Sequence, residues 1–193
     1  TNNLTALMNL GTLSMTGGSV DSYAHGLVTR GTNAYSYVTN ATITARNNIG
    51  IFSDEGGLAN VYNSRINCTN AYVANQDKNG KLILYNCTWS TNTKMTMNDG
   101  IIAVFTDSTF YDVYCYGYSG ASRVTFPTWT AANNQDDITW GDGTKTTNTN
   151  NDVWYYRAYR SSHNNEGGTY YTHIYQEING SLSLISDKVQ VNY

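Results

Sequence analysis

Apolar residues recur along the first half of the chain with a fixed spacing. The clearest series has one apolar residue every 23 positions: Val20, Ile43, Ile66 and Trp89. A second apolar series runs five residues ahead of the first: Met15, Val38, Val61 and Leu84. Small residues stand two positions before and after most of these centres. Four such units without an insertion predict a repeat architecture for residues 1–100.

A period of 23 residues indicates a β-solenoid rather than a helical repeat. The helical repeat families have units of about 33 residues or more, and no apolar stripe with the 3.6-residue helical period is present. Leucine-rich repeats require Leu at fixed positions, which this chain lacks. Short β segments separated by Gly and Asn are typical of the coils of a parallel β-helix. We therefore predict about four coils.

One polar position of the repeat predicts a stacked turn. Gly17, Asn40, Asn63 and Asn86 each stand three residues before a repeat centre. Gly and Asn are the residues that best tolerate a left-handed backbone conformation. The alternative is that Asn merely suits turns in general. We expect an Asn ladder along one edge of the coils.

The segment from Asn9 to Val20 reads NLGTLSMTGGSV and resembles coils of right-handed β-helix proteins of the pectin-lyase-like type, which include surface proteins and adhesins. The resemblance covers roughly residues 4–100 and implies a right-handed parallel β-helix. It does not imply an activity, because this scaffold carries lyases, adhesins and inert stalks.

The pattern changes after Gly100, which predicts a second domain at residues 101–193. The 105–110 segment echoes the 84–89 segment and is either a last, shortened coil or the first strand of the new domain. Strands are predicted at 154–159, 169–178 and 181–185, and Val189 and Val191 predict a closing edge strand. Asn179-Gly180 is a strong signal for a β-hairpin. A polar turn is expected at 161–168.

Four ordered motifs in this half resemble the GBS Bsp-like repeat of Gram-positive surface proteins. They are VTFPTWT at 124–130, NQDD at 134–137 with Trp140, HNNEGGTY at 163–170, and HIY at 173–175. The resemblance implies an immunoglobulin-like β-sandwich that accompanies cell-wall hydrolases and large secreted proteins. It implies an extracellular accessory module without a catalytic residue set.

Composition narrows the function classes. Only 13% of the residues are charged and the net charge is −3, whereas 25 residues are Asn and 17 are Tyr. A chain with 40% hydrophobic residues is too apolar to be disordered, and its acidic balance disfavours a nucleic-acid partner. No apolar run approaches the ~18 residues of a membrane-spanning helix. We expect a secreted piece of a larger bacterial polypeptide.

The basic and acidic residues of the first half are candidates for a polysaccharide lyase. Such enzymes need a base to abstract a proton and carboxylates or Ca²⁺ to bind the uronate. Arg46 and Arg65 are the candidate bases, and the repeat places Asp54 and Asp77 on adjacent coils. We expect these aspartates to be solvated turn residues instead, and four coils are short for a polysaccharide cleft. A non-enzymatic role is therefore predicted.

No disulfide and no metal site are expected. The repeat register places Cys68 and Cys87 about 14 Å apart on adjacent coils, too far for a disulfide, and Cys115 is expected to be unpaired. His163 and His173 flank one turn, but their spacing matches no usual zinc pattern. We expect His163 to stabilise the turn and His173 to pack beside Tyr171 or Tyr175.

Aromatic residues of the second half are the candidate ligand site, because exposed rings beside amides and hydroxyls suit carbohydrates. The candidate ligand-binding residues are Trp140, Trp154, Tyr156, His163 and Tyr171. The alternative is that these rings serve cross-strand packing. The favoured function is binding or display at the cell surface, with a glycan or cell-wall polysaccharide as partner and without a cofactor or membrane insertion. A carbohydrate-active enzyme and a structural spacer are the alternatives.

Overall fold

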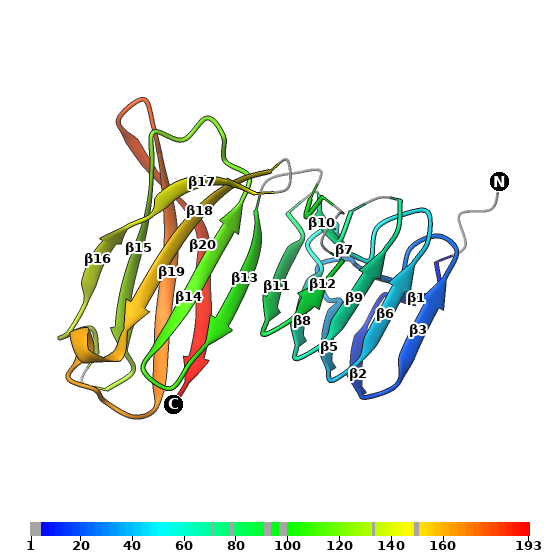
Figure 1. Ribbon diagram of the computed structural model, residues 1–193, viewed down its shortest axis with the longest axis horizontal. Helices are drawn as coiled ribbons and strands as arrows, with labels where there is room; N and C mark the ends of the chain where they lie inside the picture. Colours follow the sequence, from blue (N-terminus) through cyan, green and yellow to red (C-terminus); the bar gives the residue numbers. More distant parts are fainter. Residues whose placement is uncertain are drawn as a thin grey trace.

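The computed structural model describes residues 5–70, 72–77, 79–90, 94–96, 100–132, 134–148 and 151–193. It is built almost entirely of β-strands (Figure 1), and the predicted fold class is confirmed: a parallel β-solenoid of about four coils precedes a two-sheet β-sandwich. In the described part of the chain, no helix is long and apolar enough to cross a membrane.

The solenoid has three parallel sheets, and each coil contributes one strand to each. The first sheet contains β1 (Leu7–Asn9), β4 (Leu27–Arg30), β7 (Ile51–Asp54) and β10 (Ala74–Gln76). The second contains β2 (Thr12–Thr16), β5 (Tyr35–Thr39), β8 (Leu58–Tyr62) and β11 (Lys81–Tyr85). The third contains β3 (Ser19–Ser22), β6 (Thr42–Ala45), β9 (Arg65–Cys68) and β12 (Thr88–Trp89).

The 23-residue period is the register of these sheets. Val38 pairs with Val61 and Val61 with Leu84, and all three side chains are buried inside the solenoid. The predicted left-handed turn also forms, since Asn40, Asn63 and Asn86 have φ values of 54°, 48° and 50°. The backbone N–H of each bonds a carbonyl in the following strand of the second sheet at 2.8–3.0 Å. The repeat therefore stacks coil on coil, as predicted.

The sandwich begins on the solenoid's own sheet. β13 (Ile101–Thr106) pairs in parallel with β11, and β14 (Phe110–Tyr116) then returns antiparallel to β13. This settles the two readings of the 105–110 segment: β13 occupies the place of a fifth coil's strand but leads into the antiparallel sandwich. β18 (Asn151–Tyr159) and β17 (Thr144–Asn148) complete an eight-stranded sheet shared by both halves.

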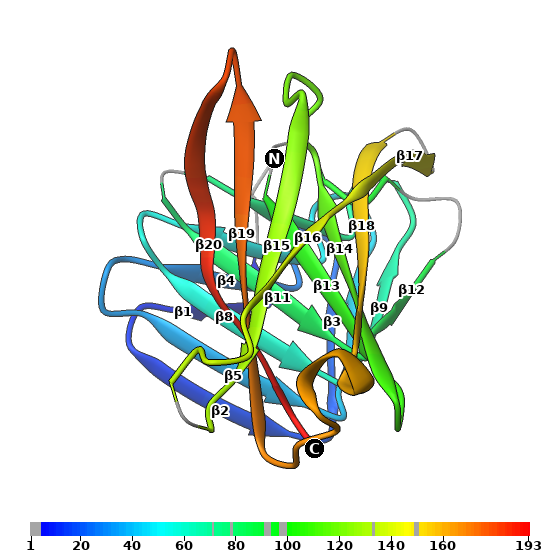
Figure 2. The same ribbon diagram turned by 90° about the vertical axis from the view of Figure 1, so that its left-hand side faces the viewer.

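A second sheet covers one face of this continuation. Its strands, in spatial order, are β16 (Thr139–Asp142), β15 (Arg123–Thr130), β19 (Thr169–Ile178) and β20 (Ser181–Asn192). Figure 2 looks onto this sheet with the solenoid behind it. Asn179-Gly180 forms the predicted hairpin, with φ values of 51° and 77°. The predicted closing strand at Val189 is instead the end of the single long strand β20.

The shared sheet separates two hydrophobic cores. Along β11, Leu82 and Leu84 point into the solenoid, whereas Ile83 and Tyr85 point into the sandwich. β13 alternates in the same way, because Ala103 lies in the first core and Val104 in the second. One set of backbone hydrogen bonds therefore supports both cores, and the last coil completes the sandwich.

Candidate functional site

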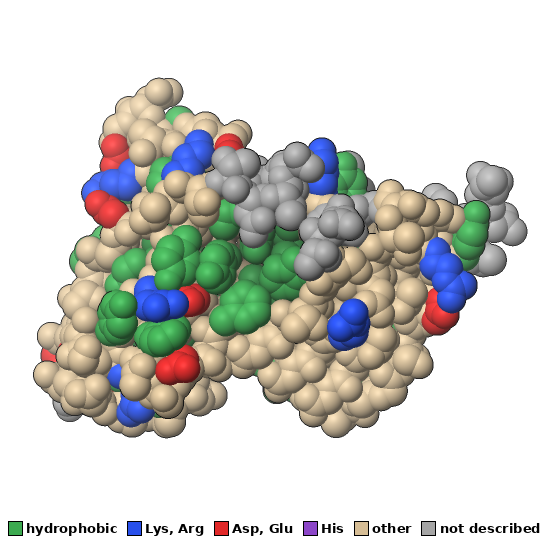
Figure 3. Space-filling view, in the orientation of Figure 1, with side chains coloured by type: hydrophobic (Ala, Val, Ile, Leu, Met, Phe, Trp, Pro, Cys, Tyr) green, Lys and Arg blue, Asp and Glu red, His purple; other side chains and the backbone are tan. Residues whose placement is uncertain are grey.

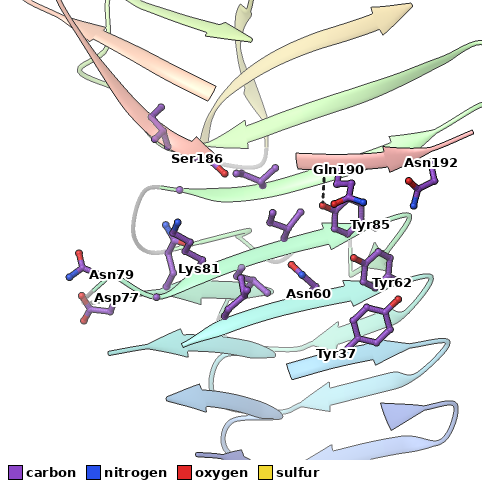
Figure 4. Close-up of a pocket in the computed structure, with 18 residues that line it drawn as sticks. Tyr37, Asn60, Tyr62, Asp77, Asn79, Lys81, Tyr85, Ser186, Gln190 and Asn192 are labelled. Atoms are coloured by element: carbon purple, nitrogen blue, oxygen red, sulfur yellow. Dashed lines mark hydrogen bonds between the residues drawn. The ribbon is translucent and has the colours of Figure 1, made fainter. Parts of the chain in front are cut away.

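A hollow lies where the sandwich leaves the solenoid. This junction groove has a volume of about 1010 Å³ (Figure 4). Its floor is the outer face of β5, β8 and β11, and its wall is β20. The turn between β10 and β11 closes one end with Asp77, Asn79 and Gly80. The groove exists because the shared sheet continues out of the solenoid while β20 stands over its outer face.

Three tyrosines on the floor form a row of contacting rings. The ring centroids of Tyr37 and Tyr62 are 4.9 Å apart, and those of Tyr62 and Tyr85 are 4.6 Å apart and nearly parallel. Exposure decreases along the row: Tyr37 is 50% exposed, and Tyr85 is 5% exposed beneath the sandwich. The row therefore leads from the open surface into the junction.

The hydroxyl of Tyr85 ties the floor to the wall. It accepts a 3.3 Å hydrogen bond from the backbone N–H of Gln190 on the edge strand β20. Burial and the neighbouring tyrosines raise the pKa of Tyr62, and burial raises that of Tyr85. Both hydroxyls are therefore protonated at neutral pH and can donate hydrogen bonds.

Amides and apolar side chains complete the lining. Asn60 lies on the floor beside the row of tyrosines, and Gln190 and Asn192 project from the wall (Figure 4). Leucine and isoleucine residues fill the surface between these polar groups: Leu58, Ile83, Ile102 and Ile185. Neutral hydrogen-bonding groups on an apolar, aromatic surface suit a ligand that is itself both polar and hydrocarbon-like.

The candidate residues from the sequence do not lie in this groove. Trp154 is buried in the sandwich core, and its ring N–H donates to the carbonyl of Tyr118 at 3.3 Å. Tyr156 stacks on Phe126 with ring centroids 5.3 Å apart. His163 is fully buried, with Nδ1 2.9 Å from a carboxylate oxygen of Asp137. The His163–Asp137 contact holds the η1 turn (Arg160–His163) against the loop between β15 and β16.

Trp140 and Tyr171 lie on the outer face of the sandwich sheet formed by β16, β15, β19 and β20. Trp140 is 58% exposed and contacts Tyr175, while Tyr171 contacts Trp129. His173 lies between them, 4.7 Å from the Trp129 ring and 6.3 Å from the Tyr175 ring, so the predicted packing of His173 beside Tyr175 is confirmed. The structure thus joins Trp140 and Tyr171 through one row of rings and separates them from the other three candidates.

A further group of aromatic side chains covers the end of the solenoid core. Figure 3 shows apolar side chains over the front of the sandwich, beside the solenoid. Trp89, Phe105 and Tyr114 pack there against the end of the solenoid core. Arg157 and Asp112 lie on the same face of the sheet and form a two-bond ion pair at 2.7 and 2.8 Å. These rings cover the apolar interior that the last coil would otherwise expose.

The residues considered for a lyase lie elsewhere. Arg46, which directly follows β6, pairs with Asp21 of β3, and Arg65 bonds Asn67 at 2.9 Å within β9. The expectation that Asp54 is solvated is wrong. Its side chain is 4% exposed and forms a 2.9 Å ion pair with Arg30 of the preceding coil.

Asp77 is exposed, as expected, and lies at the end of the groove. Among the described residues no cluster could hold a metal ion. Cys68, Cys87 and Cys115 are all buried.

Sequence reasoning missed the tyrosines of the groove, although one signal was present. Tyr62 and Tyr85 occupy the same repeat position, four residues before Ile66 and Trp89. Stacked copies of one repeat position must lie side by side on adjacent coils. The wall strand β20 had no such signal, because it is about 100 residues away from Tyr85 in the chain.

Comparison with known proteins finds a match for part of the chain. Residues 101–189 match the family model of the GBS Bsp-like repeat. The matched segment starts with the first residue of β13 and ends within β20, so it contains the whole wall of the groove except its last residues. No curated protein sequence matches the chain. The match supports a domain of a bacterial surface protein.

Proposed function

We propose that this chain is a non-enzymatic, carbohydrate-binding part of an extracellular bacterial surface protein, and that the junction groove is its binding site. The observation that carries the proposal is the groove itself: a row of contacting tyrosines, flanked by neutral amides, on a rigid sheet. The surface-protein repeat at 101–189 supports the location. The resemblance of the first half to pectin-lyase-like adhesins stays a prediction, and it also favours a binding role at the cell surface.

The rigidity of the floor favours binding. The tyrosine side chains stand on strands that are paired on both sides, so little conformational entropy is lost when a ligand docks. Tyrosine offers a broad apolar ring and a hydroxyl, a combination suited to the hydrocarbon face and the hydroxyl groups of a sugar. A groove between two sheets also excludes water from several sides of a bound chain.

A binding role is favoured over catalysis because of where the charged residues lie. The described lining contains Asp77 as its carboxylate and Lys81 as its cation, whereas general acid–base cleavage of glycosides uses two carboxylates flanking the bond. The arginines considered as lyase bases are engaged on other sheets. We therefore propose that a bound glycan is held and not cleaved.

The test is a glycan-binding screen with the full chain, followed by titration calorimetry. We expect at least one polysaccharide to bind, and Tyr37→Ala to weaken its binding about tenfold, the equivalent of about 1.4 kcal/mol. Tyr23→Ala is the matched control, because Tyr23 is 72% exposed and lies outside the groove. Absence of binding to any glycan would favour the spacer role, and release of shortened or unsaturated products would favour the enzyme.

A further inference from the structure

The charge of the junction groove bears on which glycans it can take. Its described lining carries one lysine and one aspartate, Lys81 and Asp77, whose charges cancel. The other polar lining groups are neutral: tyrosine hydroxyls, a serine hydroxyl and the amides of asparagine and glutamine. A carboxylate, sulfate or phosphate placed here would be desolvated without an excess of cationic partners, which is unfavourable. A neutral sugar does not incur this cost.

Two polar atoms beside Tyr37 and Tyr62 lack partners in the described part of the chain. The amide oxygen of Asn60 and the hydroxyl of Thr39 are buried and have no hydrogen-bond partner in the described part of the chain. In the sheet register Asn60 is directly across from Tyr37, and Thr39 is directly across from Tyr62. Buried polar atoms without partners are rare in folded proteins and call for an explanation. Both stand beside the exposed end of the tyrosine row.

The amide of Asn60 is placed to meet a ligand. Asn60 lines the groove, and Figure 4 shows its amide on the floor beside the row of tyrosines. Rotation about its terminal Cβ–Cγ bond is soft, so the amide oxygen can turn toward the groove at little cost. A ligand hydroxyl or N–H could then donate the hydrogen bond that the fold does not supply. Leucine would fill nearly the same space without a polar atom.

The opposite wall offers a second set of neutral groups. Gln190, Asn192 and the hydroxyl of Ser186 face the floor from β20. A chain lying on Tyr37 would therefore meet hydrogen-bonding groups on both sides and an aromatic ring beneath it. This arrangement matches a sugar, whose hydroxyls project around the rim of a ring with hydrocarbon faces.

On the basis of the proposed function, we propose that the groove binds an uncharged polysaccharide and discriminates against acidic ones. One sugar packs on Tyr37 and donates a hydrogen bond to Asn60, while the wall of β20 contacts the other edge of the chain. The partner class is therefore a neutral glycan, and uronic-acid polymers and anionic cell-wall polymers are disfavoured because the described lining has no excess of cationic partners.

The first experiment compares affinities of the full chain for neutral and acidic probes by titration calorimetry. Laminarin, xyloglucan and chitohexaose are the neutral probes, and polygalacturonate is the acidic probe. We expect at least one neutral probe to bind at least about tenfold more tightly than polygalacturonate. Equal or tighter binding of polygalacturonate would overturn the charge argument but leave the glycan-binding function standing. Binding of no probe of either kind would overturn both.

The second experiment tests the contact at Asn60. We expect Asn60→Leu to weaken binding of the preferred neutral probe about tenfold while the melting temperature stays equal or rises, because an unpartnered polar atom is removed. A purely structural Asn60 would instead lose stability on this change. Full affinity in Asn60→Leu would refute the contact. If Asn60→Leu does not fold, Asn60→Ala gives the same test, with Tyr23→Ala as the control for both.

Discussion

The shared sheet predicts that the two halves of the chain unfold together. Leu84 and Tyr85 are adjacent on β11, yet Leu84 is buried in the solenoid core and Tyr85 in the sandwich core. The perturbation is a pair of single substitutions, Leu84→Ala and Tyr85→Ala, on opposite faces of one strand. If the halves are one cooperative unit, both substitutions must destabilise the same transition.

The expected magnitudes follow from burial. Leu84 is fully buried, and truncating such a leucine to alanine costs about 2–5 kcal/mol. Tyr85 is 5% exposed and its ring stacks on Tyr62, so Tyr85→Ala is expected to cost about 3–5 kcal/mol. In a chain of 193 residues, the cost of Tyr85→Ala corresponds to a melting temperature roughly 6–20 °C lower. Tyr85→Phe, which removes only the long bond to Gln190, is expected to cost about 0.5–1 kcal/mol.

The assay is urea unfolding followed in parallel by circular dichroism and tryptophan fluorescence. Circular dichroism reports on strands of both halves, whereas three of the four tryptophans, Trp129, Trp140 and Trp154, report on the sandwich. We expect coincident curves for the parent chain and a shift of both curves in each variant. Two separate transitions, with Leu84→Ala moving only the first and Tyr85→Ala only the second, would refute the reasoning. Tyr23→Ala should change the stability by less than about 0.5 kcal/mol.

Three further predictions concern the solenoid. Asn63 has a left-handed φ of 48°, so Asn63→Ala should cost about 1–2 kcal/mol in thermal unfolding while Asn63→Gly is nearly neutral; equal losses would contradict this. Arg30→Met should cost about 1–2 kcal/mol in urea unfolding, because Asp54 would be buried without its partner, and adding Asp54→Asn should recover part of the loss. Burial raises the pKa of Cys68 and Cys87 to about 11, so thiol reagents should label them slowly at pH 7 in the folded chain and rapidly in urea. The unfolded thiols lose their protons first, so the free energy of unfolding should fall as the pH rises from about 9 to about 11; rapid labelling of the folded chain would contradict the burial.

Most of the fold could be predicted from the sequence repeat, because stacked coils place similar residues at a fixed spacing along the chain. Each coil repeats the same inward residues, so Val38, Val61 and Leu84 reveal their register by spacing alone. The Asn turn and the Asn179-Gly180 hairpin could also be predicted, because the backbone conformation of a turn depends on a few neighbouring residues.

The candidate site depended on tertiary structure. Outward positions of a coil carry no packing constraint, so Tyr37 and Asn60 look like ordinary variable surface residues in the sequence. They become a groove only because β13 joins β11 and brings β20 over the outer face of the solenoid sheet. The burial of Asp54 also depended on tertiary structure, because its ion-pair partner Arg30 lies on the neighbouring coil.

Sequence alone therefore determined the coil, the hairpin and the order of the two architectures, because these depend on periodicity and local backbone preference. The pairing of β13 with β11 was decided by tertiary structure, because the two readings of the 105–110 segment have similar local patterns. The groove follows from that one pairing, because it brings β20 over the solenoid sheet, and Gln190 of β20 lies about 100 residues after Tyr85 in the chain.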